Sequence, residues 1–561
     1  MQSIAYKRRE NAMKLTGRRY RTGRAADDYD VIVIGSGIGG LTNAALLSKL
    51  GKKVCVLEQH YTAGGFTHSY ENGGYEWDVG VHYIGDVHKP HSPLRRIFDV
   101  ISDGQLKWAP MDDCYDRIII DDRTYDFRSG RESFKADLKE RFPAEAEAID
   151  EYVRVVDRCS QSMRNFFFGQ ATTPTIGKMH RAVRRFMVPK EATMTVREVL
   201  EGLTQDQELI GVLTGQWGDY GMVPAEATFL MHASVVKHYF SGGNYPVGGS
   251  WTISETIIPI IQASGGEVFI YAKVNEIVVE NGKACGVRME NGDVLRANKI
   301  VSSVGARLTY GKLLPEVQRK KHKYADKLET VKPSGSSLCL FLGFKGDAKE
   351  LKLPKTNLWI YPSADHEGNV ARFSADADAE FPLLYVSFPS AKDPEWDEHY
   401  PGKSTVQVIT MAKYELFEKW RDSTWQQRGE DYETFKEKFA QRMLQALYKQ
   451  MPQLEGALDF YELATPLSTE WFHLYDRGEI YGLDHSPGRF DQDWLHPVSP
   501  VKGLYMTGQD MVTAGVGGAL IAGLLTTGAM VGFREFGKVQ KMLKEWQPSE
   551  TASGSAPASD S

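Results

Sequence analysis

Three glycines follow an apolar run near the start of the chain, at a spacing that suits phosphate binding. Gly35, Gly37 and Gly40 form a G-x-G-x-x-G pattern, with Gly39 inside it, directly after the apolar run 31–34. In such a turn the first glycine allows a tight bend, the second lets a pyrophosphate approach the backbone, and the third lets helix and strand pack closely. The following helix would direct free N–H groups and partial positive charge at the phosphates.

An acidic residue stands where a ribose would lie. Glu58 ends a second apolar run, 54–57, and comes 23 residues after Gly35. A carboxylate there can accept hydrogen bonds from the adenosine ribose, and it disfavours a 2′-phosphate. An ordinary glycine-rich turn is the alternative, but strand, helix, second strand and terminal acid occur together. The pattern therefore predicts a dinucleotide site and favours FAD or NAD over NADP.

A second group of motifs points to FAD. A Gly-Gly turn, Gly64 and Gly65, follows Glu58, and Asp78 lies in a later G-x-x-x-D-x-G stretch. A nicotinamide dehydrogenase has no need of that extra turn. No second G-x-G-x-x-G after a strand occurs between Gly65 and residue 503. NAD(P)H would therefore dock only transiently as reductant, or an electron-donor protein would serve.

Near the C-terminus, Gly508 and Asp510 follow a short apolar strand and precede a glycine-rich helix start at Gly517 and Gly518. The carboxylate of Asp510 could bind the ribityl chain and a water linked to phosphate. The helix would aim its N-terminus at the flavin N1 and O2 edge, where negative charge develops on reduction. This arrangement predicts FAD as the cofactor.

Redox chemistry at a carbon–carbon double bond also needs a proton donor or acceptor near the flavin. His82 and Tyr83 follow soon after Asp78, and Tyr481 has Asp484 and His485 close behind it. These three residues are the catalytic candidates. The alternative is that they only support the site, through hydrogen bonds to residues around it. His232 and His238 are six apart, about 240° around a helix, so no metal site is expected.

Further elements must position these residues. The region from 265 to 304 predicts short strands joined by Asn-Gly turns. Strands alternate with helices after residue 333, which predicts a second sheet covered by helices. A hairpin is expected around residues 121–122, and helices over 132–142, 144–168, 414–420 and 432–451. The fold class is α/β.

Charge and apolar content limit the partners. The net charge is −6, so nucleic acid is not expected, and five scattered cysteines argue against disulfides and for a reducing compartment. Residues 1–24 are strongly basic without an apolar core, so this is no secretory signal. A solvated arm, contact with anionic lipid headgroups and a transit peptide remain open. The apolar stretch 519–533 contains glycines and threonines and is interpreted as a buried helix.

One internal segment mixes aromatic and basic residues. Residues 166–189 would suit either a surface helix that enters a bilayer interface or a helix that packs domains together. The C-terminal 547–561 is rich in Ser, Ala and Pro and is expected to be disordered. The chain is therefore expected to be cytoplasmic or peripherally membrane-associated, and not secreted.

The acid, the Gly-Gly pair and G-x-x-x-D-x-G resemble the FAD signature of amine oxidases, phytoene desaturases and carotenoid isomerases. Amine oxidases usually place Arg after the Gly pair, where this chain has Phe66. Passages outside these motifs resemble the all-trans-retinol 13,14-reductase (retinol saturase) family. They are WDVGVHYIGDV from Trp77, MHASVVKHYFSGGNYPVGGS from Met231, SFPSAKDPEW from Ser387, DYETFK from Asp431, MPQLEG from Met451, YGLDH from Tyr481 and LYMTGQD from Leu504.

The resemblance implies a Rossmann-like FAD/NAD(P)-binding domain of the glutathione-reductase and amine-oxidase type, interleaved with a substrate domain of mixed sheet and helices. Residues 1–28 would form the basic arm, and 547–561 the tail. The FAD domain would comprise 29–100, 240–310 and 495–546, and the membrane-facing substrate domain 101–239 and 311–494. In the FAD domain the backbone of Val274 would bind the adenine. The segment at Tyr481 resembles the one that faces the flavin ring in related desaturases.

The implied activity is hydride transfer at flavin N5 to or from a double bond of a long apolar polyene or lipid. Saturation, desaturation and isomerisation all remain open, with peripheral membrane contact expected. A flavin amine oxidase is disfavoured by Phe66. A non-enzymatic lipid-binding protein, like the Rab GDP-dissociation inhibitors, would show eroded cofactor motifs, whereas Glu58 and Asp510 are intact.

Overall fold

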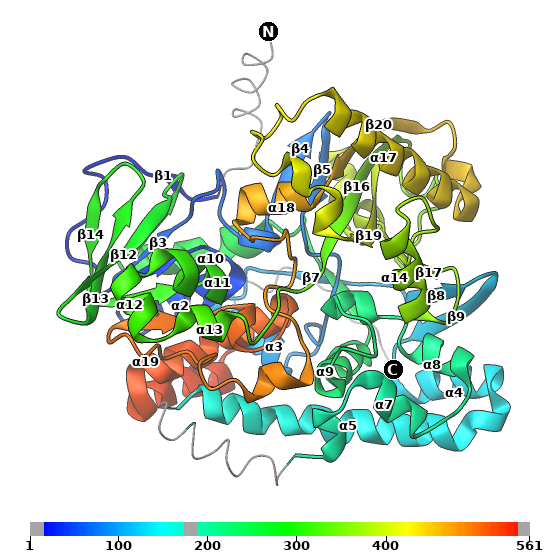
Figure 1. Ribbon diagram of the computed structural model, residues 1–561, viewed down its shortest axis with the longest axis horizontal. Helices are drawn as coiled ribbons and strands as arrows, with labels where there is room; N and C mark the ends of the chain where they lie inside the picture. Colours follow the sequence, from blue (N-terminus) through cyan, green and yellow to red (C-terminus); the bar gives the residue numbers. More distant parts are fainter. Residues whose placement is uncertain (1–15, 173–176, 178–187, 548–561) are drawn as a thin grey trace.

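Two large β-sheets lie side by side in the computed structural model, which describes residues 16–172, 177 and 188–547 (Figure 1). In the first sheet every neighbouring pair of strands is parallel. Its strand order is β1 (Arg18–Arg19), β11 (Glu267–Ile270), β3 (Val54–Leu57), β2 (Val31–Ile34), β15 (Lys299–Ser302) and β21 (Leu504–Met506). Stretches far apart in the sequence therefore build one sheet.

Both faces of this parallel sheet are covered. Val31 and Val33 pack with helices, whereas Ile32 and Ile34 face a small antiparallel sheet. The helices are α2 (Ile38–Lys49), α10 (Thr252–Ala263) and α19 (Gly515–Glu545), and the small sheet comprises β12 (Val274–Glu280), β13 (Lys283–Met289) and β14 (Val294–Arg296). A strand buried on both faces is a continuous apolar run. The strands predicted over 31–34, 54–57 and 265–304 are confirmed.

The first described residues lie along the edge of this sheet. β1 pairs in parallel with β11, so that Arg18 stands opposite Phe269. The Tyr20 hydroxyl donates a hydrogen bond to Asp293 at 2.8 Å. From residue 16 to residue 20 the basic N-terminal segment therefore lies along the edge of the sheet through its backbone, while the side chains of Arg18 and Arg19 are exposed to solvent. Residues 1–15 lie outside the described residues, as do residues 548–561 of the tail.

The second sheet has seven strands and mixed directions. Its order is β20 (Leu458–Ala464), β16 (Ser336–Lys345), β19 (Lys403–Ala412), β18 (Leu384–Ser387), β17 (Asn357–Tyr361), β8 (Cys114–Ile120) and β9 (Arg123–Arg128). The pair β17 and β8 is parallel, and the other neighbours are antiparallel. The predicted hairpin is confirmed as β8 and β9. Its place at the edge of the later sheet was not predicted.

One predicted helix is wrong. Residues 414–420 form two separate 3₁₀ turns, η6 (Tyr414–Leu416) and η7 (Glu418–Trp420). Tyr414, Phe417 and Trp420 are all buried in the core of the seven-stranded sheet. Their spacing of three matches the three residues per turn of a 3₁₀ helix, so tertiary packing selects that geometry. The helix predicted over 432–451 is confirmed as α17 (Glu430–Gln450).

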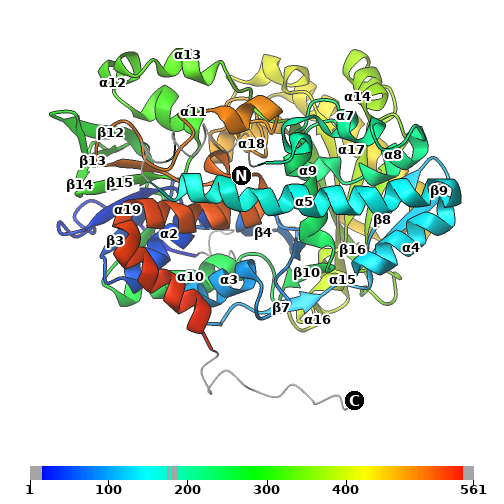
Figure 2. The same ribbon diagram turned by 90° about the horizontal axis from the view of Figure 1, so that it is seen from below.

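Helices join the two sheets. The predicted helices 132–142 and 144–168 are confirmed as α4 (Arg131–Arg141) and α5 (Ala146–Gln170). In Figure 2 the long helix α5 extends across the molecule past both sheets. It packs against α9 (Phe229–Tyr239) and α19. Much of the segment 166–189 that was expected at a membrane or a domain interface, residues 173–176 and 178–187, lies outside the described residues.

Shorter elements complete the described chain. The strands are β4 (Ser69–Asn72) with β5 (Tyr75–Asp78), and β6 (Ile84–Gly85), β10 (Gly243–Pro246) and β7 (Trp108–Pro110). The helices include α3 (Pro93–Ser102), α7 (Val196–Glu201), α8 (Gln207–Leu213), α11 (Ala306–Leu308), α12 (Glu316–Lys321), α13 (Tyr324–Leu328), α14 (His366–Ala375), α15 (Pro389–Lys392), α16 (Trp396–His399), α18 (Pro466–His473) and the 3₁₀ helix η4 (Trp217–Tyr220).

α19 stands apart in length and composition. Within the described part of the chain it is the one helix long and apolar enough to cross a membrane, by length and composition alone. Half of its apolar window is buried inside the protein. Gly532 interrupts it with φ 75° and ψ 171°, which produces the bend visible in Figure 2.

Candidate cofactor and substrate site

The glycines after β2 shape the start of the site. Gly35 has φ +89°, which side chains disfavour, and Gly37 is the N-cap of α2. A Cβ at Gly40 would overlap the carbonyl oxygen of Gly35, so strand and helix pack closely there. A Cβ at Gly39 would lie 2.9 Å from Cα of Gly508, which brings the two predicted cofactor motifs together. Around Gly37 nothing lies within 4 Å of a built Cβ.

Glu58 lies in a cavity of about 120 Å³, here called the Glu58 cavity. Gly35, Gly37, Gly65 and Val274 also line it. The Glu58 carboxylate accepts hydrogen bonds from Ser36 N at 2.9 Å and from Ser36 Oγ at 2.7 Å. These bonds fix the carboxylate beside the first glycine turn, where a ribose would meet it.

The Gly64–Gly65 turn contacts the first turn directly. Both residues have positive φ, +126° and +57°. The amide of Gly64 donates to Ser36 Oγ at 3.0 Å, and a Cβ at Gly65 would lie 3.0 Å from Cα of Gly37. After this turn Phe66 stacks on His473, with ring centroids 4.0 Å apart. Gly65, Phe66 and His473 therefore form a second wall of the Glu58 cavity, next to Gly37.

A central cavity of about 200 Å³ continues from the Glu58 cavity. The two cavities share Gly37, Phe66, Ser303 and Tyr475. The central cavity extends to Gly508 and the start of α19, and to the seven-stranded sheet at Trp359, Tyr385, Ile409 and Met411. The two adjacent cavities together extend from Glu58, after the first glycine motif, to the start of α19, after the last one.

The residues fit an elongated dinucleotide, and FAD is the cofactor that this site accommodates. A methyl group on Gly37 would project into open space, where a pyrophosphate would lie at the N-terminus of α2. Glu58 and Val274 would hold the adenosine end, and Gly508 with the start of α19 the flavin end. Bound FAD would supply two-electron chemistry beside the seven-stranded sheet.

Two residues predicted to bind the cofactor, Asp78 and Asp510, form hydrogen bonds with other residues of the protein. The Asp78 carboxylate accepts hydrogen bonds from Ser69 Oγ, from the Tyr245 hydroxyl, and from Ser250 N and Oγ. Asp510 accepts from the amides of Ala306 at 2.7 Å and Leu483 at 2.9 Å. Neither residue lines the Glu58 cavity or the central cavity. Both carboxylates join segments of the chain that surround the site.

The first residues of α19 line two different cavities. Gly515, Val516 and Ala519 line the central cavity, whereas the predicted residues Gly517 and Gly518 do not. Successive helical residues turn by about 100°, so the helix start faces the cofactor with a different set of residues than expected. Sequence reasoning missed Gly515, whose φ of +77° starts the helix. Its position before Val-Gly-Gly was the available signal.

Gly517 and Gly518 instead line a third cavity of about 510 Å³, the helical cavity. Helices α3, α5, α9 and α19 surround it with mainly apolar side chains. These include Leu94, Ile97, Met163, Phe167, Met231, Val235, Ile521, Leu524 and Leu525. The helical cavity meets the central cavity at Gly80, His82, Asp219, Tyr481, Gly515 and Val516. An apolar cavity therefore lies between α5, α9 and the cofactor end of the central cavity.

The three catalytic candidates lie around this junction. His82 and Tyr481 line both cavities, whereas Tyr83 lines only the helical cavity. Burial and the charge of Lys392 lower the pKa of His82 to about 3, so this imidazole is neutral. Tyr83 stacks on Tyr239, with centroids 4.2 Å apart.

Sequence reasoning missed three ionisable residues, namely Asp219 at this junction and Asp116 and Lys392 behind it. The Tyr83 hydroxyl lies between the carboxyls of Asp116 and Asp219. Lys392 Nζ donates to the carbonyl of His82 at 3.0 Å and to the side chain of Asn357. Only Asp219 carried a sequence signal, as a lone acid in the glycine- and aromatic-rich stretch GQWGDYG.

Comparison with known proteins agrees with this geometry. Residues 33–101 match the family model described as NAD(P)-binding Rossmann-like domain. All-trans-retinol 13,14-reductase of Danio rerio is 37% identical over 92% of this chain and 88% of the relative. A Danio rerio relative called inactive all-trans-retinol 13,14-reductase is 31% identical over 92% and 88%. Prolycopene isomerase of Daucus carota is 26% identical over 86% and 76%.

Solved structures share the fold at lower identity. An oxidoreductase from Methanosarcina mazei has a TM-score of 0.58 at 17% identity, covering 88% of this chain and 98% of that chain. Putrescine oxidase has a TM-score of 0.58 at 14% identity, covering 89% and 98%. The interleaved Rossmann-like architecture expected from the sequence is confirmed. With 37% identity across nearly its whole length, this chain belongs to the all-trans-retinol 13,14-reductase family.

Proposed function

We propose that this protein is an FAD-dependent oxidoreductase that saturates a carbon–carbon double bond of a long apolar polyene, such as a retinoid. One observation carries the proposal. A helix-walled apolar cavity of about 510 Å³ meets the cofactor end of the central cavity at six shared residues. The family membership supports the reaction class, since the Danio rerio relative is an all-trans-retinol 13,14-reductase.

The chain contributes binding, orientation and water exclusion. Apolar side chains such as Leu94, Met163 and Val235 remove a polyene from water, at about 25 cal/mol for each Å² of apolar surface buried. The polyene can then lie with one double bond at the junction with the central cavity. The start of α19 directs its partial positive charge at this junction, where it favours anionic groups.

The reductant and the location are part of the proposal. Between β3 and β21 we find no second G-x-G-x-x-G, so NAD(P)H would dock transiently or an electron-donor protein would reduce the flavin. A polyene dissolves in lipid, so the protein would contact a membrane peripherally. Phe533 on α19, which is 70% exposed, and Arg164 at the rim of the helical cavity support such contact.

The oxidative half-reaction tests the function, because it follows whether a substrate reoxidises the reduced flavin. The purified protein is expected to be yellow, and it is reduced anaerobically with dithionite. A retinoid alcohol, a longer carotenoid and an unsaturated fatty acid are then added separately. We expect one polyene to reoxidise the flavin and to gain two hydrogen atoms by mass spectrometry. If no compound reoxidises the flavin, the proposal is wrong. A product of unchanged mass with altered retention would instead support isomerisation, as in the carrot relative.

A further inference from the structure

Asp219 is the only carboxylic acid that lines both the central and the helical cavities among the described residues. It lies in η4, between Gly218 and Tyr220. Its partly exposed surface faces these two cavities. An acid in this position can reach a double bond that lies at the junction.

The surrounding hydrogen bonds show which carboxyl carries a proton. The Tyr83 hydroxyl oxygen lies 2.8 Å from Asp116 Oδ2 and 2.9 Å from Asp219 Oδ2. A phenol has one hydrogen, so it can donate to only one of them. The other contact requires a proton on the carboxyl, which then donates to the phenol oxygen.

Asp116 is the carboxylate of the pair. Gln216 Nε2 donates to it at 2.6 Å and Asn357 Nδ2 at 2.9 Å, in addition to Tyr83. Three donors stabilise an anion. The carboxyl of Asp219 makes no hydrogen bond in the described chain other than the contact with Tyr83. Asp219 is therefore the protonated member and donates to Tyr83.

The electrostatics agree with this assignment. Burial raises the pKa of Asp219 well above its usual range, and the nearby charge of Asp116 adds to that shift. Burial also raises the pKa of Asp116, but its donors and the Lys392 ammonium oppose the shift. Two neighbouring carboxyls in different environments separate into one acid and one anion.

We propose that Asp219 is the catalytic acid, which delivers its proton to one carbon of the substrate double bond. This inference rests on the proposed function. Hydride from the reduced flavin adds to one alkene carbon and the Asp219 proton to the other. The alkene π bond, the N5–H bond of the reduced flavin and the Asp219 O–H bond would break, two C–H bonds would form, the flavin would be oxidised and the alkene reduced. Asp219 is left as a carboxylate and regains a proton from solvent before the next turnover.

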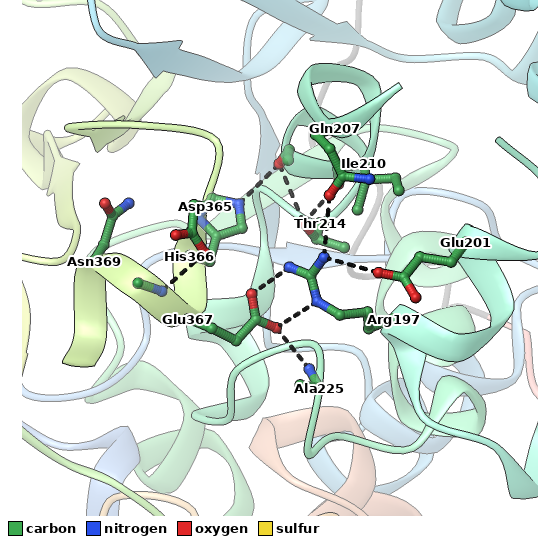
Figure 3. A network of polar contacts seen from close by, with 12 residues as sticks. Arg197, Glu201, Gln207, Ile210, Thr214, Ala225, Asp365, His366, Glu367 and Asn369 are labelled. Carbon is green, nitrogen blue, oxygen red and sulfur yellow. Dashed lines mark hydrogen bonds and ion pairs between the residues drawn. The ribbon is translucent and has the colours of Figure 1, made fainter. Parts of the chain in front are cut away.

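A polar network connects α7 and α8, which precede η4 in the chain, to α14 (Figure 3). Arg197 on α7 pairs with Glu367 on α14, and Glu367 accepts from the amide of Ala225 at 2.8 Å. His366 hydrogen-bonds the carbonyl of Gly211 at 2.9 Å, which ties α8 to α14 just before η4. The Tyr361 hydroxyl then donates to the carbonyl of Gly215 at 2.7 Å. The backbone leading to Asp219 is thus anchored to the seven-stranded sheet.

The other candidates fit the role less well. His82 has a pKa of about 3, so its imidazole is neutral at neutral pH, and the single N–H that it keeps is a very weak acid. Tyr83 is bound between two carboxyls and does not line the central cavity. Tyr481 lines both cavities and is the remaining rival, but burial raises the pKa of its phenol above the ordinary value. It is therefore a weaker acid than a protonated Asp219.

The test compares Asp219→Asn with Glu479→Gln and Tyr481→Phe in the flavin-loaded protein. An asparagine at 219 can still donate to Tyr83, so the fold is expected to persist. Glu479 is a matched control, because it is buried, burial raises its pKa to about 7, and it lines neither cavity. Flavin content and flavin oxidation by a one-electron acceptor report on the integrity of each variant.

We expect Asp219→Asn to slow polyene reduction by roughly 100- to 10,000-fold, the usual contribution of a general acid. Glu479→Gln is expected to retain the wild-type rate. Equal rates for wild type and Asp219→Asn would overturn the role of Asp219, as would a loss found only in Tyr481→Phe. If wild type itself reduces no polyene, the proposed function fails instead, and the second readout below still judges the protonation of Asp219.

The second readout does not depend on activity. Infrared spectra of protein labelled with carbon-13 at the aspartate carboxyl report protonated aspartic acids separately from glutamic acids. We expect a protonated aspartic acid at neutral pH in wild type, and its loss in Asp219→Asn. A band that persists in this variant would place the proton on another aspartate and overturn the inference.

Discussion

The Glu58 cavity and the helical cavity both open on the central cavity, yet they are built differently. The first is shaped mainly by backbone, because Gly35, Gly37 and Gly65 leave room and helix α2 presents free amides. The second is shaped by side chains from four helices, such as Leu94 and Val235. Backbone amides suit a group found in every dinucleotide, namely the phosphates, whereas side chains adapt to the shape of one substrate. Single substitutions should therefore affect the two ends differently.

The largest effect on FAD binding is expected at Gly37. Gly37→Ala adds a methyl group where the pyrophosphate would lie, and overpacking costs about 1–3 kcal/mol. We expect the dissociation constant for FAD to rise by roughly 100-fold at the upper part of that range, measured by fluorescence titration of the apoprotein. Gly488→Ala is the matched control, since nothing lies within 4 Å of its built Cβ and it lines none of the three cavities. Equal affinities for the two variants would contradict this placement of the phosphates.

A smaller loss of FAD affinity is expected from a substitution at Glu58, in the same cavity. Glu58→Gln keeps the shape but removes the charge that would bind the ribose hydroxyls, and a hydrogen bond to a charged group contributes about 1.5 kcal/mol. The same titration should show FAD binding weakened about tenfold. Glu280→Gln on β12 is the control, because Glu280 lies outside the Glu58 cavity. If both variants bind FAD like wild type, the ribose does not meet Glu58.

A substitution in the helical cavity should lower kcat/KM for the polyene without changing the affinity for FAD. Val235→Trp fills part of this cavity, and an overpacking cost of about 1 kcal/mol would lower kcat/KM for a long polyene about fivefold. Val317→Trp, at a position that is 73% exposed on α12, is the control. If Val235→Trp also lost affinity for FAD, the Glu58 cavity and the helical cavity would not be separate binding regions.

A further prediction concerns the pH dependence of folding stability at Lys392, beneath the junction. Burial lowers the pKa of Lys392 to about 7, so between about pH 7 and 10 the unfolded chain binds a proton that the folded chain lacks. Folding stability should therefore rise with pH across that window, by on the order of 1 kcal/mol per pH unit. Denaturant unfolding should show this rise in wild type and in the exposed control Lys345→Met, but not in Lys392→Met. A rise that persists in Lys392→Met would assign it to other groups.

Local signals predicted the parallel sheet well. The runs 31–34 and 54–57 are strands of the expected length, because a strand covered on both faces must be apolar throughout. The glycine turn after β2 was predictable for a related reason, since its conformation and close contacts restrict residue type. In contrast, residues 414–420 form 3₁₀ turns because three aromatic side chains share one core.

The sequence by itself determined the Rossmann-like fold, the dinucleotide turn and the family, because each depends on residue types close together in the chain. It did not determine the partners of Asp78 and Asp510, whose carboxylates are bound by the protein. Only the tertiary structure placed Asp116 and Asp219 on either side of Tyr83. The protonation of an acid depends on its burial and on charges from distant segments. The candidate proton donor therefore became visible only when the chain was folded.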